Sequence, residues 1–138
     1  MKKLSSVVCV LALLLCVCLF AGCASAEPAA PVVKSETNCI VINYFRPDGE
    51  YGNWDIWLWE AGGAGVAYAF TGETEAGAQL IVPNHGFGSK EMCFLTRKGG
   101  DMWLEKDTAD DRSFMLDENG NAEIFLVSGD ATIYDVAQ

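Results

Sequence analysis

Residues 54–60 read WDIWLWE, and this run decides the fold that the sequence predicts. In a β-strand, successive side chains point to opposite faces, so residues two apart share a face. One face of the run is purely apolar and is expected to pack in a core: Trp54, Ile56 and Leu58. The other face begins with a carboxylate and carries two indoles: Asp55, Trp57 and Trp59. The run therefore predicts a strand with one buried side.

Similar short runs recur along the chain, and turn residues separate them. Residues 47–49 (PDG) form a turn sequence, and Asn119-Gly120 between apolar runs predicts a hairpin. No segment has a helical apolar stripe over three turns. The pattern predicts an all-β fold, an immunoglobulin-like antiparallel β-sandwich. The expected strands are residues 39–46, 54–60, 67–71, 79–82, 92–98, 113–116, 122–127 and 132–136.

Residues 1–22 are expected to be a lipoprotein-type signal peptide. Lys2 and Lys3 precede an apolar stretch that is too short for a membrane-spanning helix, and small residues follow it. Residues 20–23 (FAGC) resemble a bacterial lipobox, which predicts lipidation of Cys23; cleavage at residues 24–26 (ASA) by an ordinary signal peptidase is the alternative. Residues 23–37, rich in Ala, Pro and Glu, then form a flexible tether, and residues 38–138 form the sandwich.

The charge of the chain narrows the range of partners. The full chain carries a formal net charge of −10, from 9 basic and 19 acidic residues. Removal of Lys2 and Lys3 with the signal leaves 7 basic against 19 acidic residues, a net charge of −12. No basic run remains, so no nucleic acid and no anionic membrane surface is expected as a partner. A neutral polymer would meet no such repulsion.

Two cysteines fall within the predicted sandwich, and their state is open. Outside the cytoplasm Cys39 and Cys93 could form a disulfide, or they could be buried free thiols. They lack metal-ligand spacing, and His85 is the single histidine of the chain. We therefore expect no metal and no cofactor.

The outward indoles of the 54–60 run offer one kind of binding surface. Trp57 and Trp59 would stand about 7 Å apart, two strand residues along. That spacing suits consecutive hexose units, because pyranose rings present flat C–H faces to aromatic planes. Burial of this second face inside the fold is the alternative, since tryptophan is usually well buried.

A second stretch, residues 101–112, carries Trp103 and charges of both signs. Sugar hydroxyls need donors and acceptors beside an aromatic platform, and paired charged residues supply both. A solvated loop with surface ion pairs explains the same charge pattern, and each such pair contributes about 0–1 kcal/mol. The charges alone therefore do not decide between the two.

The two stretches together resemble the family 41 carbohydrate-binding modules, which occur at the N-termini of pullulanases. Five segments resemble that family in the same order. They are residues 40–49 (IVINYFRPDG), 54–59 (WDIWLW), 67–73 (AYAFTGE), 103–112 with its Trp-x-x-Lys-Asp block and following Asp-Arg, and 122–134 with its Gly-Asp-x-Thr-Ile-Tyr ending.

The resemblance implies a β-sandwich that binds α-1,4-linked glucose chains. In that family two tryptophans at Trp-x-Trp spacing stack on consecutive glucose units, and a lysine and an aspartate bond to the hydroxyls. The matching residues here are Trp57 and Trp59 as the platform, with Lys106 and Asp111 as polar partners and Trp103 beside them. The chain departs from the family pattern at Asn43, Phe45 and Phe125 and in a longer Gly99-Gly100 loop.

The leading hypothesis is a non-catalytic, α-glucan-binding lipoprotein on the bacterial cell surface. Starch, glycogen, pullulan and maltooligosaccharides are the ligands considered, and a surface glycosidase is a potential partner. The alternative is a protein-binding surface lipoprotein module of a cell-surface complex. An enzyme is not expected, because glycoside hydrolysis needs two carboxylates across a cleft and a small sandwich leaves little room for one.

Overall fold

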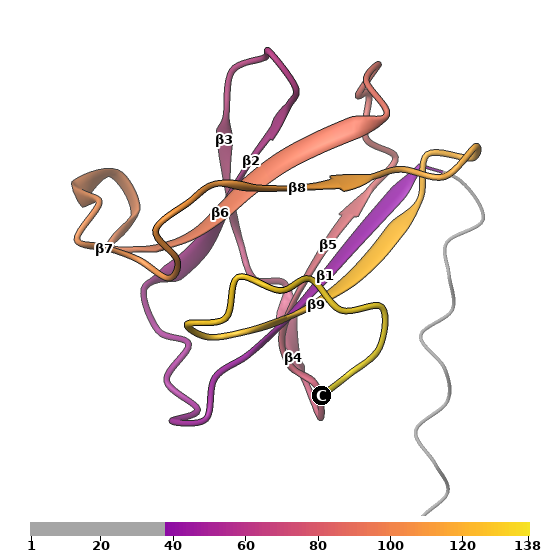
Figure 1. Cartoon of the computed structure of the whole chain (residues 1–138). Coiled ribbons are helices and arrows are strands. Elements are labelled where there is room, and N and C mark those ends of the chain that lie inside the picture. Colours follow the sequence, from indigo (N-terminus) through magenta and orange to yellow (C-terminus); the bar gives the residue numbers. More distant parts are fainter. Residues whose placement is uncertain (1–37) are drawn as a thin grey trace, which may run out of the picture. The chain divides into compact units, whose positions relative to one another are not determined.

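The computed structural model describes residues 38–138, which form two β-sheets packed face to face (Figure 1). Sheet A has the order β4-β5-β1-β9, and sheet B has the order β3-β2-β6-β7 with β8 also paired to β6. A single 3-10 turn, η1 (Gly100–Met102), interrupts the strands of this part of the chain. The strands are β1 (Cys39–Phe45), β2 (Trp54–Glu60), β3 (Val66–Ala69), β4 (Gly72–Thr74), β5 (Gly77–Pro83), β6 (Glu91–Lys98), β7 (Glu105–Lys106), β8 (Arg112–Met115) and β9 (Ala122–Val127).

The predicted signal peptide, lipidation site and tether lie outside the described residues. Within residues 38–138, no helix has the length and apolar character needed to cross a membrane.

The all-β sandwich predicted from sequence is confirmed. Every strand pair is antiparallel except β1 with β9, which run parallel. The inward faces of both sheets meet in one apolar cluster, which supplies the main favourable term for folding. The fully buried members of that cluster are Ile40, Ile42, Tyr44, Ile56, Leu58, Leu80, Met92, Phe94 and Leu126.

Strand β2 shows the alternation that its sequence predicts. Trp54, Ile56 and Leu58 are 5%, 0% and 1% exposed and face the core. The alternate residues Asp55, Trp57 and Trp59 are partly exposed on the outward face of sheet B. The face that carries the two indoles is therefore not part of the core.

The predicted Asn119-Gly120 hairpin is wrong. A turn does form there, since the Gly120 amide donates to the Asp117 carbonyl oxygen (3.1 Å) and Gly120 has φ 75°. However, β8 before the turn pairs with β6 in sheet B, whereas β9 after it pairs with β1 in sheet A. The turn carries the chain from one sheet to the other, and strand pairing of this kind depends on contacts far along the chain.

The predicted strand at residues 132–136 is also wrong, because only Tyr134 forms a bridge, with Phe125. Two backbone hydrogen bonds of 2.9 and 3.0 Å close that bridge. Three short elements were not predicted from sequence: β4, η1 and β7. Each is two or three residues long, too short to show a period.

Cys39 and Cys93 are free thiols. Cys39 alternates with the core residue Ile40 and faces outward from sheet A, whereas Cys93 alternates with the core residue Phe94 and faces outward from sheet B. The two side chains therefore point away from each other across the sandwich, which excludes the disulfide that the sequence left open.

A buried polar network joins the two sheets at one end of the core, centred on Asp107, whose side chain is 2% exposed. Its Oδ1 atom accepts hydrogen bonds from Tyr44 Oη (2.7 Å), Ser128 Oγ (2.9 Å) and the Gly129 amide (3.2 Å). Burial raises the pKa of Tyr44 far above its usual value, so the phenol remains a donor to the carboxylate.

Two arginines balance the charge of this carboxylate. Arg46 Nη1 lies 3.9 Å from Asp107 Oδ1, and Arg112 Nη2 lies 4.0 Å from Oδ2. The side chains of Arg46 and Arg112 are 13% and 6% exposed, so all three charges are largely removed from water. A buried charge needs such partners to avoid its desolvation cost.

We predict that Asp107→Ala lowers the free energy of unfolding by about 3–5 kcal/mol, because two largely buried guanidinium groups lose their carboxylate. Urea denaturation followed by tryptophan fluorescence measures the change. The matched control is Asp48→Ala, which breaks the 2.7 Å pair between Arg46 and an exposed carboxylate; its effect should be far smaller. Equal effects of the two variants would contradict the structural role of Asp107.

Candidate functional site

The register of sheet B brings the predicted site residues onto one face. Asp55 lies opposite Arg97, and Trp57 lies opposite Leu95. Lys106 of β7 then lies opposite Arg97 on its other side. Because cross-strand partners share a face of the sheet, the outward side chains of β2, β6 and β7 form one surface.

Lys106 and Asp111 form an ion pair at the edge of this surface. Lys106 Nζ lies 3.0 Å from Asp111 Oδ1 and also donates to the Ala109 carbonyl oxygen (3.1 Å). The side chains are 37% and 55% exposed, so water screens the pair and both groups can reach a ligand.

The residues next to this pair explain how it is held in place. Lys106 precedes the buried Asp107, and Asp111 precedes the buried Arg112. Asp107 directly follows β7 and Asp111 directly precedes β8, so anchoring Asp107 and Arg112 in the core holds the backbone from which Lys106 and Asp111 project.

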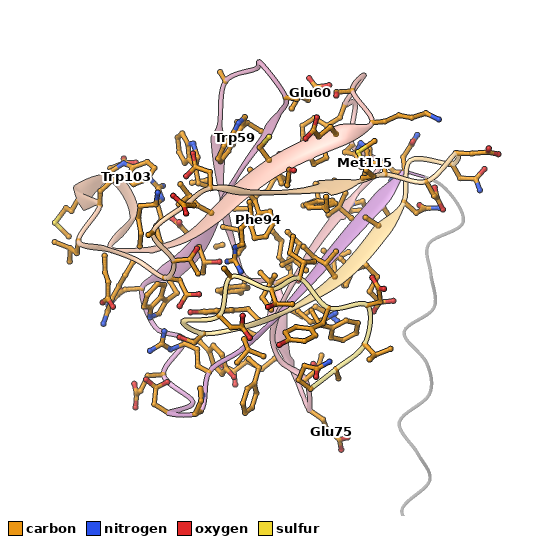
Figure 2. The ribbon with its side chains drawn as sticks, viewed as in Figure 1. Trp59, Glu60, Glu75, Phe94, Trp103 and Met115 are labelled. Carbon is orange, nitrogen blue, oxygen red and sulfur yellow. The ribbon has the colours of Figure 1, made fainter. Side chains whose placement is uncertain are left out.

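Trp103 projects from the loop between β6 and β7, and Figure 2 shows it well apart from Trp59 on β2. It is 45% exposed and ends the η1 turn with φ 48°. Left-handed backbone is rare for a bulky residue and costs about 1–3 kcal/mol, so neighbouring contacts must hold it. The flanking Met102 and Leu104 are 72% and 66% exposed, which makes this loop an apolar projection.

Arg97 lies between two of the indoles. Its guanidinium carbon is 4.4 Å from the ring centre of Trp57 and 4.3 Å from that of Trp103. Nε and Nη2 donate to the two carboxylate oxygens of Asp55, at 2.7 and 3.2 Å. The side chain is 1% exposed, so this cation is held by a bidentate carboxylate and two π-faces rather than by water.

The contacts of Trp57 and Trp59 differ. Trp57 packs against Arg97 and lies 5.5 Å from Trp103 between ring centres, edge to face. A β-carbon at Gly65 would overlap the pyrrole edge of Trp57, so only glycine allows this approach. Trp59 makes no aromatic or cation–π contact with any residue that the structure describes.

The surface lacks the donor set of a metal centre. Across residues 38–138, no three His, Cys, Asp or Glu side chains come together in a way that could hold a metal ion. Arrangements of partly exposed indoles beside a charged pair are suited instead to flat ligands with polar edges.

The sequence profile of the bacterial pullanase-associated domain matches residues 38–135. The chain belongs to this family. The resemblance to pullulanase-associated modules that the sequence shows is thereby confirmed.

Solved structures share the fold of this pullanase-associated domain. The product complex of SpuA, a multi-modular glycogen-degrading pneumococcal virulence factor, is 24% identical with a TM-score of 0.58, over 75% of this chain and 11% of that one. A streptococcal structure concerned with α-glucan recognition by family 41 carbohydrate-binding modules is 23% identical with a TM-score of 0.55, over 77% and 50%. Ligand-free mutant PulA from Klebsiella pneumoniae is 16% identical with a TM-score of 0.55, over 75% and 11%. This chain thus spans about a tenth to a half of the proteins it matches.

The structure of the pullanase-associated domain places all five predicted binding residues on or beside the outward face of sheet B: Trp57, Trp59, Trp103, Lys106 and Asp111. Sequence reasoning missed Arg97. The one available signal was a lone arginine next to Thr96 in an apolar strand, and the register that sets it against Asp55 cannot be read locally.

We predict strong coupling between Arg97 and Asp55 in this domain. Arg97→Leu alone should lower the free energy of unfolding by about 3 kcal/mol, because Asp55, 15% exposed in its side chain, loses its cation. Combining it with Asp55→Leu should recover much of that loss, since an apolar pair can replace a buried ion pair. Urea denaturation of the four proteins of this double-mutant cycle gives the coupling energy. Additive effects would show that the two groups act independently.

Proposed function

We propose that this pullanase-associated domain binds α-glucans without catalysing a reaction. The main support for this proposal is the outward face of β2, where Trp57 and Trp59 are partly exposed beside an accessible Lys106–Asp111 pair. Solved neighbours described as recognising α-glucan share the fold, which supports the choice of ligand.

The two indoles would act as the stacking surface. Positions 57 and 59 of one strand are about 7 Å apart, a spacing suited to consecutive glucosyl rings. Each ring buries its C–H face on an indole and keeps its hydroxyls at the rim in water. Arg97 beneath Trp57 fixes that indole before the ligand arrives, which reduces the ordering cost of binding.

Lys106 and Asp111 would fix the orientation of the glucan. A lysine offers three N–H donors and a carboxylate offers only acceptors, so together they match both roles of a hydroxyl. Because their ion pair is solvent-exposed, sharing these groups with a ligand costs little. Trp103 would border the site on the loop side, in edge-to-face contact with Trp57.

The acidic side chains near the platform are engaged in ways that suit binding rather than catalysis. Asp55 accepts a bidentate bond from Arg97, and Asp111 is paired with Lys106. A glycosidase needs one carboxylic acid that donates a proton and a second carboxylate across the scissile bond. We therefore propose a module that holds glucan while a separate surface glycosidase acts on it.

Binding by a single open site should be modest, because a shallow surface leaves most hydroxyls wet. Lipidation at Cys23 would place many copies on one bacterial surface, and a polymeric glucan could then engage several at once.

Protein binding is a second candidate function, favoured by the exposed apolar side chains of Met102 and Leu104 beside Trp103. Apolar projections of this type can anchor a protein partner. The two functions differ in which variants matter: removal of Met102 and Leu104 should abolish capture of a protein partner, whereas stacking of the first two glucosyl rings should depend on Trp57 and Trp59.

We predict that Trp57→Ala with Trp59→Ala abolishes retardation in amylopectin or pullulan affinity gels, because both stacking surfaces are lost. Phe45→Ala is the matched control, since Phe45 is an aromatic residue 37% exposed on sheet A. It should migrate as the unmodified protein does. Unchanged retardation of the double variant would refute the assigned site, and release of reducing sugar by the purified protein would contradict a purely binding role.

We predict that the full chain incorporates labelled palmitate in bacteria and partitions into detergent, and that Cys23→Ser abolishes both. The small pair before Cys23 is the reason to expect lipidation there. Cys18→Ser is the control, because no such pair precedes Cys18. An unlabelled wild-type protein that appears in the medium would instead support cleavage at residues 24–26.

A further inference from the structure

Two hollows meet where β2 begins, at the edge of the surface already described. The first has a volume of about 470 Å³ and the second about 520 Å³. Trp54 and Ala69 line both, so the hollows are neighbours that share a wall. Each is within the range of about 300–1,000 Å³ that small-molecule sites occupy.

The first hollow lies on the line of the two outward indoles. Along β2, the step from Trp59 to Trp57 continues to Asp55, each step about 7 Å, and the turn residue Asn53 precedes the strand. Asp55 and Asn53 both line the first hollow. If a glucan chain stacks on Trp59 and then on Trp57, its next glucosyl unit therefore lies at this hollow.

The walls of the first hollow are chemically mixed. On one side is Ala69 of β3, and on the other is the loop with the exposed side chains of Met102 and Leu104. Asn53 and Lys98 supply an amide and an ammonium group. Neither side chain makes a hydrogen bond to another residue in the range 38–138, and the Lys98 ammonium lies 5.7 Å from the ring centre of Trp54. The N–H donors of both groups are therefore available to hydroxyl groups.

The backbone at Asn53 is held in an uncommon conformation. Asn53 has φ 65°, and its carbonyl oxygen accepts a hydrogen bond from the Gly99 amide (2.7 Å). This bond ties the start of β2 to the loop that forms the opposite wall. The loop wall of the hollow is thus attached to the start of β2.

The second hollow is likewise lined by both apolar and polar side chains. Phe70 packs one face on Tyr44, with ring centres 5.8 Å apart and planes within 8°, and also lines the hollow. Tyr51 adds a second aromatic ring to the lining, and Glu73 an exposed carboxylate. Aromatic surfaces beside unpaired polar groups are suited to carbohydrate rather than to a purely apolar ligand.

We propose that this double hollow is an extension of the glucan site and takes the glucosyl units that follow the two on Trp57 and Trp59. The proposal rests on the proposed function, because it assigns a longer stretch of the same ligand class. It makes the domain selective for longer α-glucan chains. Stacking on the platform is retained, and Asn53 and Lys98 add hydroxyl contacts that a short oligosaccharide does not reach.

Isothermal titration with maltose and maltoheptaose tests the extension, because maltose supplies only the two rings that the platform holds. Ala69→Gln fills the wall shared by both hollows with a neutral side chain at an exposed edge-strand position. Asn53→Gly removes the amide at a positive φ that glycine adopts readily, so it should fold normally. Ala131→Gln is the matched control, since Ala131 is exposed and lines neither hollow.

The wild-type protein should bind maltoheptaose about tenfold more tightly than maltose, which corresponds to about 1.4 kcal/mol. Ala69→Gln and Asn53→Gly should weaken only the longer ligand, while Ala131→Gln changes neither. Equal binding of the two ligands by the wild type, or equal weakening of both by the hollow variants, would overturn the extension and leave the platform intact. If the wild type bound neither ligand, the proposed function itself would fail, and the extension with it.

Discussion

Asp107 is the side chain through which the two sheets and the site are held in register. Its carboxylate accepts hydrogen bonds from Tyr44 of β1 in sheet A and from Ser128, the residue after β9. It also lies within ion-pair distance of Arg112 of β8 in sheet B. β7 itself is two residues long and pairs with β6 over that length alone. Ladder hydrogen bonds would fix so short a strand poorly, so we infer that the buried carboxylate is what keeps Lys106 on the outward face.

The site uses charge on both sides of one sheet. Inside the sandwich, Asp107 is balanced by Arg46 and Arg112; outside it, Asp55 is balanced by Arg97 beneath two indoles. Both arrangements remove an ion pair from water, which is costly unless the geometry is good. Each ion pair orients a part of the site that apolar packing alone would not orient. The Asp107 pairs set the direction of β7, and the Asp55–Arg97 pair sets the angle of Trp57. The rigid half of the site is thus β2, and the loop with Trp103 is attached to it through Arg97.

Local alternation explains what could be predicted from the sequence. The faces of β2 follow from a period of two within one strand, and no knowledge of its neighbours is needed. By contrast, the partners of β8 and β9 depend on pairing over many residues, and so the turn at Asn119-Gly120 was predicted as a hairpin when it joins two sheets. Arg97 was missed for the same reason, because its role appears only when Asp55 lies opposite. The family resemblance supplied Lys106 and Asp111, whose outward direction depends on the buried residues that follow them.

Trp57 and Trp59 differ in how strongly their contacts indicate a binding role. Trp57 is needed by the fold, since it covers Arg97 and packs against Gly65, so its presence alone would not indicate a ligand. Trp59 lies two residues further, opposite Cys93, and is partly exposed without a ring or cation partner in residues 38–138. The ring and cation contacts of the fold therefore account for the placement of Trp57 and leave that of Trp59 unexplained. The argument for a ligand on this face therefore depends more on Trp59 than on Trp57, although the family motif contains both.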